Sequence, residues 1–119
     1  MPARIICKVL DFETPFFVSV NNRYFRKGIV LSKEWRLGTK NFRIVAASNW
    51  RKEILNEEQF VIETLIPFRY DWDNLSKFLC DGLQGIVYRT DKQILRGAAE
   101  RVPGRKTVRV VLYTARILP

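Results

Sequence analysis

The stretch from Lys33 to about Leu55 restricts the fold most, because its apolar residues follow the repeat of an amphipathic helix. They recur mostly at steps of three and four residues, which places side chains on one helical face. The apolar or small members of this series are Trp35, Gly38, Phe42, Val45, Ala46, Trp50 and Ile54. Ser32 precedes them as a candidate N-cap, although Trp35 stands where a capping box has Glu. One long helix from Lys33 to Leu55 is therefore expected.

Short β-type runs flank this helix on both sides. The residues from Arg4 to Phe12 and from Gln59 to Phe68 are rich in Ile, Val, Leu and Phe, so each run predicts a strand. Two more strands are predicted from Lys92 to Val102 and from Thr107 to Ile117, and the sequence Pro-Gly-Arg-Lys between them predicts a hairpin. The residues from Thr14 to Gly28 contain turn-forming Pro, Asn and Gly and predict a loop or an irregular hairpin.

A second helix is predicted between these strands. Asp71 or Asp73 is its expected N-cap and Gly85 its expected end. Its apolar stripe consists of Leu75, Phe78, Leu79 and Leu83. The order strand, loop, helix, strand, helix, strand, strand predicts a single α+β domain over residues 1–119, with a small mixed β-sheet packed against two main helices. At 119 residues and 47% apolar content, the chain can bury such a core without disulfides or metals.

The charge balance favours a polyanionic partner. The chain has 21 Lys and Arg against 12 Asp and Glu, for a formal net charge of +9. Basic side chains bind nucleic acid by neutralising phosphates and releasing counterions, without reading the base sequence. For any single basic residue, a solvated surface position is the alternative. The candidate DNA-binding residues are Arg23, Arg26, Lys27, Lys33, Arg36, Lys40, Arg105 and Lys106.

The missing residue types exclude several kinds of site. The chain contains no histidine, which removes Ser-His and Cys-His nucleophile pairs and every His-ligated metal site. Cys7 and Cys80 lack metal-binding or redox spacing and are expected to be free, buried thiols in a reducing compartment. The apolar run from Ile5 to Cys7 is too short for a signal peptide or a membrane span. A cytoplasmic protein that does not contact the membrane is expected.

Four of the five aspartates lie between Arg69 and Asp91, in the segment RYDWDNLSKFLCDGLQGIVYRTD. Capping of the second helix explains one member of the Asp71 and Asp73 pair. Alternatively, both bind Mg²⁺ or Mn²⁺, which prefer carboxylate oxygens, and Asp91 returns to the same point after a helix of about three turns. Three carboxylates in a basic surround suit metal-assisted phosphodiester hydrolysis. Spacing alone leaves both interpretations open.

The segment resembles a known family signature. The chain reads D-W-D-N-L-S-K at 71–77, then C-D-G-L-Q-G-I-V-Y at 80–88, and then Asp91. This resembles the signature of the RusA family of Holliday-junction resolvases, which is D-x-D-N-x-x-K followed by D-x-L-x-G and an acidic position. Upstream, S-V-N-N-R-Y-F at 19–25 resembles the family's S-V-N-x-x-Y segment. The resemblance covers roughly residues 13–118. Many members have two consecutive acids where this chain has Thr90 and Asp91, so the first acid is missing here.

The resemblance implies a Mg²⁺-dependent, homodimeric endodeoxyribonuclease, with Mn²⁺ as a possible substitute. Such an enzyme resolves four-way junctions by paired symmetric nicks during DNA recombination and repair, in a bacterium or in a phage or prophage within one. The metal ligands it implies are Asp71, Asp73 and Asp91, with Lys77 as the catalytic lysine near the scissile phosphate. Asn74 and Asp81 receive supporting roles: Asn74 orients the metal loop, and Asp81 pairs with Lys77 one turn away. A surface ion pair without catalysis is the alternative for Lys77.

A non-catalytic protein that binds branched or single-stranded nucleic acid is the competing interpretation. The aromatic residues Phe16, Phe17, Tyr24 and Phe25 lie among basic residues, an arrangement that suits stacking on unpaired bases. Packing in the protein core is the alternative for each of them.

Overall fold

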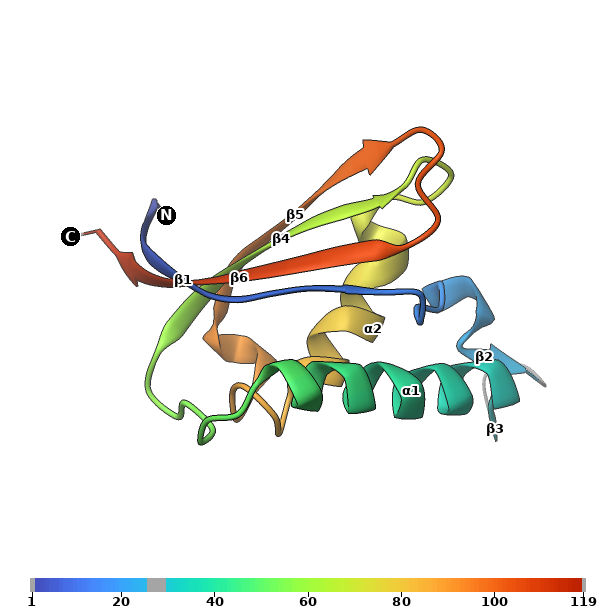
Figure 1. The fold of residues 1–119 in the computed structure, drawn as a ribbon, viewed down its shortest axis with the longest axis horizontal. Coiled ribbons are helices and arrows are strands. Elements are labelled where there is room, and N and C mark those ends of the chain that lie inside the picture. Colours follow the sequence, from blue (N-terminus) through green and yellow to red (C-terminus); the bar gives the residue numbers. More distant parts are fainter. Residues whose placement is uncertain (1, 26–29, 119) are drawn as a thin grey trace.

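The chain forms its helices and strands close to the predicted positions. The computed structural model describes residues 2–25 and 30–118. In chain order the elements are β1 (Ala3–Thr14), the 3-10 turn η1 (Val20–Asn22), β2 (Tyr24–Phe25), β3 (Val30–Leu31), α1 (Lys33–Asn49), β4 (Gln59–Pro67), α2 (Trp72–Leu83), the 3-10 turn η2 (Asp91–Gln93), β5 (Ile94–Val102) and β6 (Val108–Ile117). The predicted α+β class, with a mixed sheet and two main helices, is confirmed (Figure 1).

Four strands form one mixed sheet in the order β1-β6-β4-β5, with β5 parallel to β4 and the other pairs antiparallel. The predicted hairpin of β5 and β6 is wrong, because β4 lies between them. Phe60, Ile62 and Ile66 of β4 are fully buried. Buried backbone groups need hydrogen-bond partners, and a central position gives β4 a paired strand along both sides. The strand β5 exposes alternate residues, and it occupies an edge of the sheet.

Both helices pack on the same face of the sheet (Figure 1). Their contact is aromatic: the Phe78 ring of α2 lies 5.3 Å from the Phe42 ring and 5.2 Å from the Trp35 ring of α1, centroid to centroid. Gly82 makes the close approach possible, since a Cβ atom there would lie 2.4 Å from Cδ2 of Phe42. The packing fixes α2, and with it the acidic motif, against the sheet.

Helix α1 ends earlier than predicted. Ser32 caps its start as expected, with its side chain accepting a hydrogen bond from the Trp35 backbone N–H at 3.0 Å. The helix stops at Asn49, not at Leu55. The side chains of Ser48 and Asn49 both donate hydrogen bonds to the Val45 carbonyl, and such side-chain bonds to the backbone compete with helix continuation.

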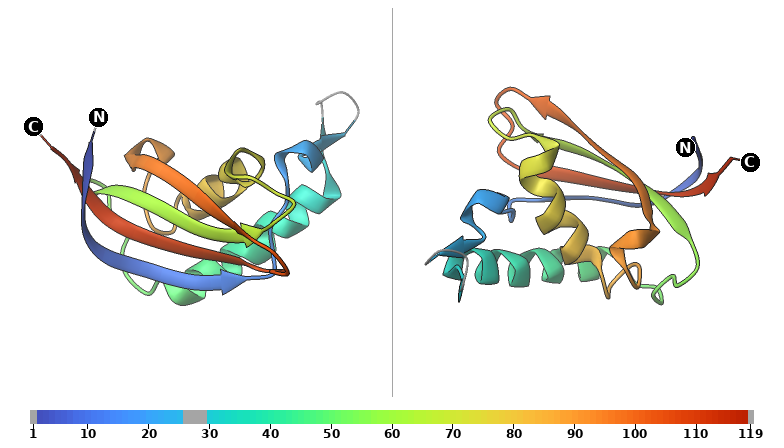
Figure 2. Two further views of the ribbon diagram at one scale, coloured as in Figure 1. Left: turned by 90° about the horizontal axis from the view of Figure 1, so that it is seen from above. Right: turned by 180° about the vertical axis from the view of Figure 1, so that it is seen from behind.

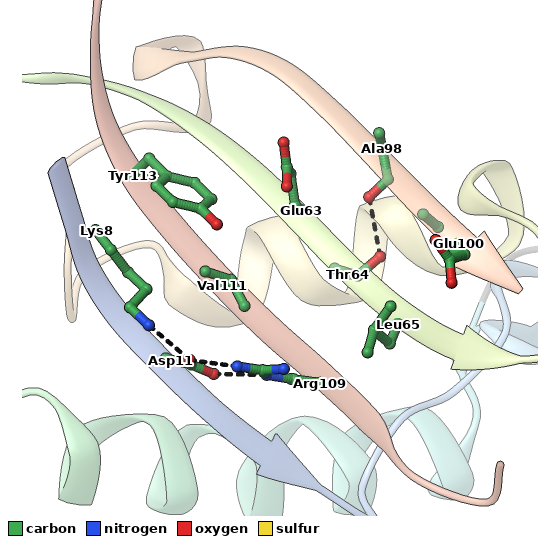
Figure 3. Close-up of a pocket in the computed structure, with 11 residues that line it drawn as sticks. Lys8, Asp11, Glu63, Thr64, Leu65, Ala98, Glu100, Arg109, Val111 and Tyr113 are labelled. Atoms are coloured by element: carbon green, nitrogen blue, oxygen red, sulfur yellow. Dashed lines mark hydrogen bonds and ion pairs between the residues drawn. The ribbon is translucent and has the colours of Figure 1, made fainter. Parts of the chain in front are cut away.

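The opposite face of the sheet is left open by the two helices (Figure 2). A hollow of about 350 Å³ lies on it, lined by side chains from all four strands (Figure 3). Asp11 accepts two hydrogen bonds from Arg109 there, at 2.9 and 2.7 Å, and one from Lys8 at 3.2 Å. The hollow's lining carries three acids, Asp11, Glu63 and Glu100, against the two bases Lys8 and Arg109. Among the described residues that line it, none was predicted as a site residue.

The Asp11–Arg109 pair gives a stability prediction. Hydrogen bonds from Arg109 lower the pKa of Asp11 from 3.8 to about 2. Because the folded-state pKa is depressed, the pair stabilises the fold above about pH 4, and this contribution is lost as the pH falls to about 2. Asp11→Asn is expected to cost about 1 kcal/mol at pH 7, since both side chains contact solvent. Urea unfolding at pH 7 and near pH 2 measures the difference in unfolding free energy between variant and parent. A difference near pH 2 as large as that at pH 7 contradicts the prediction.

Candidate active site

The acidic motif begins where β4 ends. Pro67 closes β4, and the Tyr70 N–H donates to the Pro67 carbonyl at 3.1 Å, which turns the chain into α2. Asp71 is the N-cap: its Oδ1 accepts from the Asn74 backbone N–H at 2.9 Å, and its own N–H donates to Oδ1 of Asn74 at 3.0 Å. This reciprocal capping box selects Asp71 over Asp73 as the cap. It also explains why Asn74 stands three residues after Asp71.

Asp73 lies in the first turn of α2 and is exposed. No hydrogen bond or ion pair joins its carboxylate to another residue of the described chain. Lys77 follows it by four residues, so both side chains project from the same side of the helix. The two residues therefore stand one turn apart on one side of α2, with Asp73 in its first turn and Lys77 in its middle.

Lys77 and Asp81 form the predicted ion pair, with Nζ of Lys77 3.0 Å from Oδ2 of Asp81. Their side chains are 43% and 35% exposed. Exposed pairs of this kind contribute about 0–1 kcal/mol to stability. The contact with Asp81 therefore orients the Lys77 side chain, and breaking it costs little free energy.

Asp91 is held beside the other end of α2. Its backbone N–H donates to Oε1 of Gln84, the C-cap of α2, at 3.1 Å. Thr90 caps η2, where its hydroxyl accepts from the Lys92 N–H at 3.4 Å and its own N–H donates to Oε1 of Gln93 at 3.1 Å. Thr90 therefore fixes the backbone that presents Asp91.

A hollow of about 340 Å³ between α2, η2 and β5 contains part of the predicted site. Lys77, Asp81 and Asp91 line it together. Asp71 and Asp73 are not among its lining residues, although Trp72 between them is, so the hollow reaches the first residue of α2 without including either acid. Over residues 2–25 and 30–118, no three Asp, Glu or Cys side chains lie close enough to hold one metal ion. The expected return of Asp91 to Asp71 and Asp73 is therefore not present in the described chain.

Sequence reasoning missed other residues of this hollow. Trp72, Ser76 and Cys80 line it at steps of four residues along α2, and that helical spacing was a signal available in the sequence. From β5 it is lined by Ile94, Leu95, Arg96 and Gly97. No local pattern identified these, because their approach to α2 depends on β5 taking the edge of the sheet.

Cys80 contributes no nucleophile. Both cysteines are free, as predicted, but the prediction that both are buried is wrong, because Cys7 is exposed and Cys80 is only partly buried. Burial, together with the nearby Asp81 and Asp91 carboxylates, raises the pKa of the Cys80 thiol to about 12. The thiol is therefore neutral at physiological pH, and a thiolate is the form that reacts.

The predicted DNA-binding residues fall into three groups. Lys33, Arg36 and Lys40 lie exposed on the N-terminal half of α1, and Lys106 is exposed in the turn before β6. The other described members have partners: Arg23 stacks on the Tyr24 and Trp35 rings, and Arg105 pairs with Glu13 at 3.0 Å. The predictions for Arg26 and Lys27 lie outside the described residues.

The candidate aromatic residues differ in exposure. Tyr24 and Phe16 are 43% and 37% exposed, whereas Phe17 packs edge-on against Tyr70 with the ring centroids 5.5 Å apart. The Phe25 side chain lies outside the described part of the structure.

None of the helices in the described ranges is long and apolar enough to cross a membrane. A search of curated proteins gave no match to this chain. The family model described as Endodeoxyribonuclease RusA matches residues 29–113, well over half of the chain. The match contains the whole 71–91 segment, whereas the S-V-N-N-R-Y-F segment at 19–25 precedes it. The chain therefore belongs to the RusA family of endodeoxyribonucleases.

Proposed function

We propose that this protein resolves four-way DNA junctions by Mg²⁺-dependent phosphodiester hydrolysis, in recombination and repair. Membership of the RusA family implies endodeoxyribonuclease activity of the Holliday-junction-resolving type. One observation carries the finer proposal: Asp71 and Asp73 stand at the N-terminal end of α2, Lys77 follows Asp73 by one helical turn, and the Asp73 carboxylate is exposed with no partner in the described chain.

The donor chemistry of this end of α2 fits a divalent cation. Asp73 offers a free carboxylate, and Asp71 uses Oδ1 for the cap and retains Oδ2. Magnesium and manganese both prefer such oxygen ligands. The proposal assigns the ion to Asp71 and Asp73, and keeps Asp91 as a third ligand that the described conformation does not bring to the same point. When bound, the ion polarises the phosphate and activates water.

Lys77 supplies positive charge beside the reacting phosphate. Its ammonium group projects from the same side of α2 as Asp73, and Asp81 holds it at 3.0 Å before DNA arrives. Because this pair is exposed and weak, a phosphate oxygen replaces Asp81 at small cost. Lys77 then stabilises the negative charge that develops on the phosphate.

The basic residues of α1 are proposed to hold the DNA backbone. Lys33, Arg36 and Lys40 are exposed there, and Lys106 adds a charge at the turn before β6. The proposal also includes Arg23, Arg26 and Lys27, and Arg105 with its Glu13 partner. Such contacts read the shape and charge of a junction more than its sequence.

A homodimer is part of the proposal, because resolution needs two symmetric cuts and one chain carries one motif. A two-fold dimer matches the symmetry of the junction. Sedimentation is expected to give twice the chain mass of 14.0 kDa at micromolar concentration, whereas a single species near that mass counts against the dimer. The proposal also places the enzyme in bacterial cytoplasm, encoded by the host or by a phage or prophage.

The test incubates the protein with a synthetic four-way junction or with a linear duplex of equal length, in Mg²⁺, Mn²⁺ or chelator. Paired symmetric nicks on the junction, with either metal and not with chelator, are expected. Binding without cleavage under every condition supports the second candidate, a non-catalytic protein for branched or single-stranded nucleic acid. The exposed rings of Phe16 and Tyr24 favour that candidate, because they are accessible for base stacking.

A further inference from the structure

Trp72 stands between the two acids of the motif and packs on a glycine of the edge strand. A Cβ atom at Gly97 of β5 would lie 2.2 Å from Cζ2 and 2.8 Å from Cε2 of the Trp72 indole, and 3.1 Å from Cγ2 of Ile62. Contacts under 3.0 Å are essentially absent for real Cβ atoms, so any side chain at position 97 requires the indole to move. The indole therefore lies directly against the β5 backbone.

This contact joins the acidic motif to a rigid element. Gly97 pairs with Ile62 of β4, one of the two inner strands, so its backbone position is set by the sheet. Trp72 is the first residue of α2, and its neighbours on either side are Asp71 and Asp73. The backbone that carries the indole also carries both carboxylates. Fixing the indole therefore fixes the Cα positions of Asp71 and Asp73.

We propose that Trp72, seated on Gly97, is a positioning residue that sets the Asp71 and Asp73 carboxylates relative to β5. This inference rests on the proposed function and concerns residues that touch neither DNA nor metal. A side chain that orients metal ligands typically changes metal affinity or activity by about 10–100-fold when its contact is lost. The expected consequence is a defect in metal binding and turnover that is separate from folding and from DNA binding.

The first variant is Gly97→Ala, which forces the indole away from β5. Mn²⁺ binding by titration calorimetry, without DNA, is expected to weaken about tenfold, and cleavage at fixed Mg²⁺ to fall by a similar factor. Junction binding in chelator is expected to stay within about twofold of the parent, because the exposed lysines and arginine of α1 are unchanged. Ala98→Ser is the matched control, since it adds one atom to the next residue of β5, which lines the open face of the sheet.

Rescue distinguishes positioning from general destabilisation. Trp72→Phe removes the part of the ring that meets the new methyl group, so Trp72→Phe combined with Gly97→Ala is expected to recover most of the Mn²⁺ affinity. Trp72→Ala, which leaves β5 unchanged, is expected to weaken Mn²⁺ binding about tenfold even if Gly97→Ala does not fold.

Two outcomes overturn the inference and can be told apart. Parent-like Mn²⁺ affinity in folded Gly97→Ala and in Trp72→Ala rejects the positioning role alone, with the proposed function intact. A parent protein that binds no Mn²⁺ and cuts no junction rejects the proposed function, and the positioning role with it.

Discussion

Asp73→Asn is expected to lower junction cleavage by on the order of 10²–10³-fold while junction binding in chelator stays within about twofold. The substitution keeps the shape of the side chain and removes its charge, which the proposed metal needs. Asp73 is exposed and has no partner among the described residues, so its replacement costs little stability, within about 1 kcal/mol from the lost interaction with the helix dipole. Single-turnover cleavage, gel-shift binding and thermal unfolding measure the three quantities.

Glu34→Gln is the matched control for Asp73→Asn. Glu34 is the acidic residue in the first turn of α1, as Asp73 is in the first turn of α2, and it too is exposed. The control removes the same charge from the same kind of helix position, outside the acidic segment, and is expected to cleave at the parent rate. Cleavage that survives Asp73→Asn would contradict the proposed ligand role and return Asp73 to an ordinary surface acid.

The elements that the sequence predicted well are those set by local patterns. The strand β4 and the helix α2 were placed within about two residues, because Pro67 ends one and the Asp71 cap begins the other. The end of α1 was missed because apolar Trp50 and Ile54 continue the helical spacing. Trp50 is buried in an extended conformation instead, and Ile54 is exposed. Periodicity identifies apolar residues but does not say which of them stay helical.

The order of the strands was beyond local reasoning. The turn at Gly104, with φ of 81°, joins β5 to β6 and reads as a hairpin. Whether two joined strands pair depends on which strand best fills the centre of the sheet, and that depends on the whole core. The strand order matters for the site, because it places β5 at the edge of the sheet, beside α2, where Gly97 contacts Trp72.

The candidate site divides in the same way. The ion pair of Lys77 with Asp81 was predicted from spacing within one helix, and Asp71 was one of the two expected caps, but its reciprocal bonds with Asn74 were not predicted. The place of Asp91 depends on a turn and on the bond from its N–H to Gln84, which no spacing rule gives. In the described chain Asp91 shares a hollow with Trp72, the residue between the two acids, but Asp71 and Asp73 do not line that hollow.

Asp71 is proposed to act both as a helix cap and as a metal ligand, and two substitutions separate these roles. Asparagine caps helices about as well as aspartate, so the free energy of unfolding of Asp71→Asn is expected to lie within about 0.5 kcal/mol of the parent value. Asp71→Ala loses the bond to the Asn74 N–H and is expected to cost about 1 kcal/mol. If the carboxylate charge is what the reaction needs, both variants lose on the order of 10²–10³-fold in cleavage despite their different stabilities.

A cap variant far from the motif completes the comparison. Ser32→Ala removes the cap of α1, where the Ser32 hydroxyl accepts from the Trp35 N–H at 3.0 Å, and is expected to cost about 1 kcal/mol with cleavage unchanged. Equal instability in Ser32→Ala and Asp71→Ala, with cleavage lost only in the latter, assigns the loss to the carboxylate. Full cleavage by Asp71→Asn would contradict that assignment, because the reaction would then require only the capping role of Asp71. Asp73 would be the remaining acid that the metal needs at this end of α2.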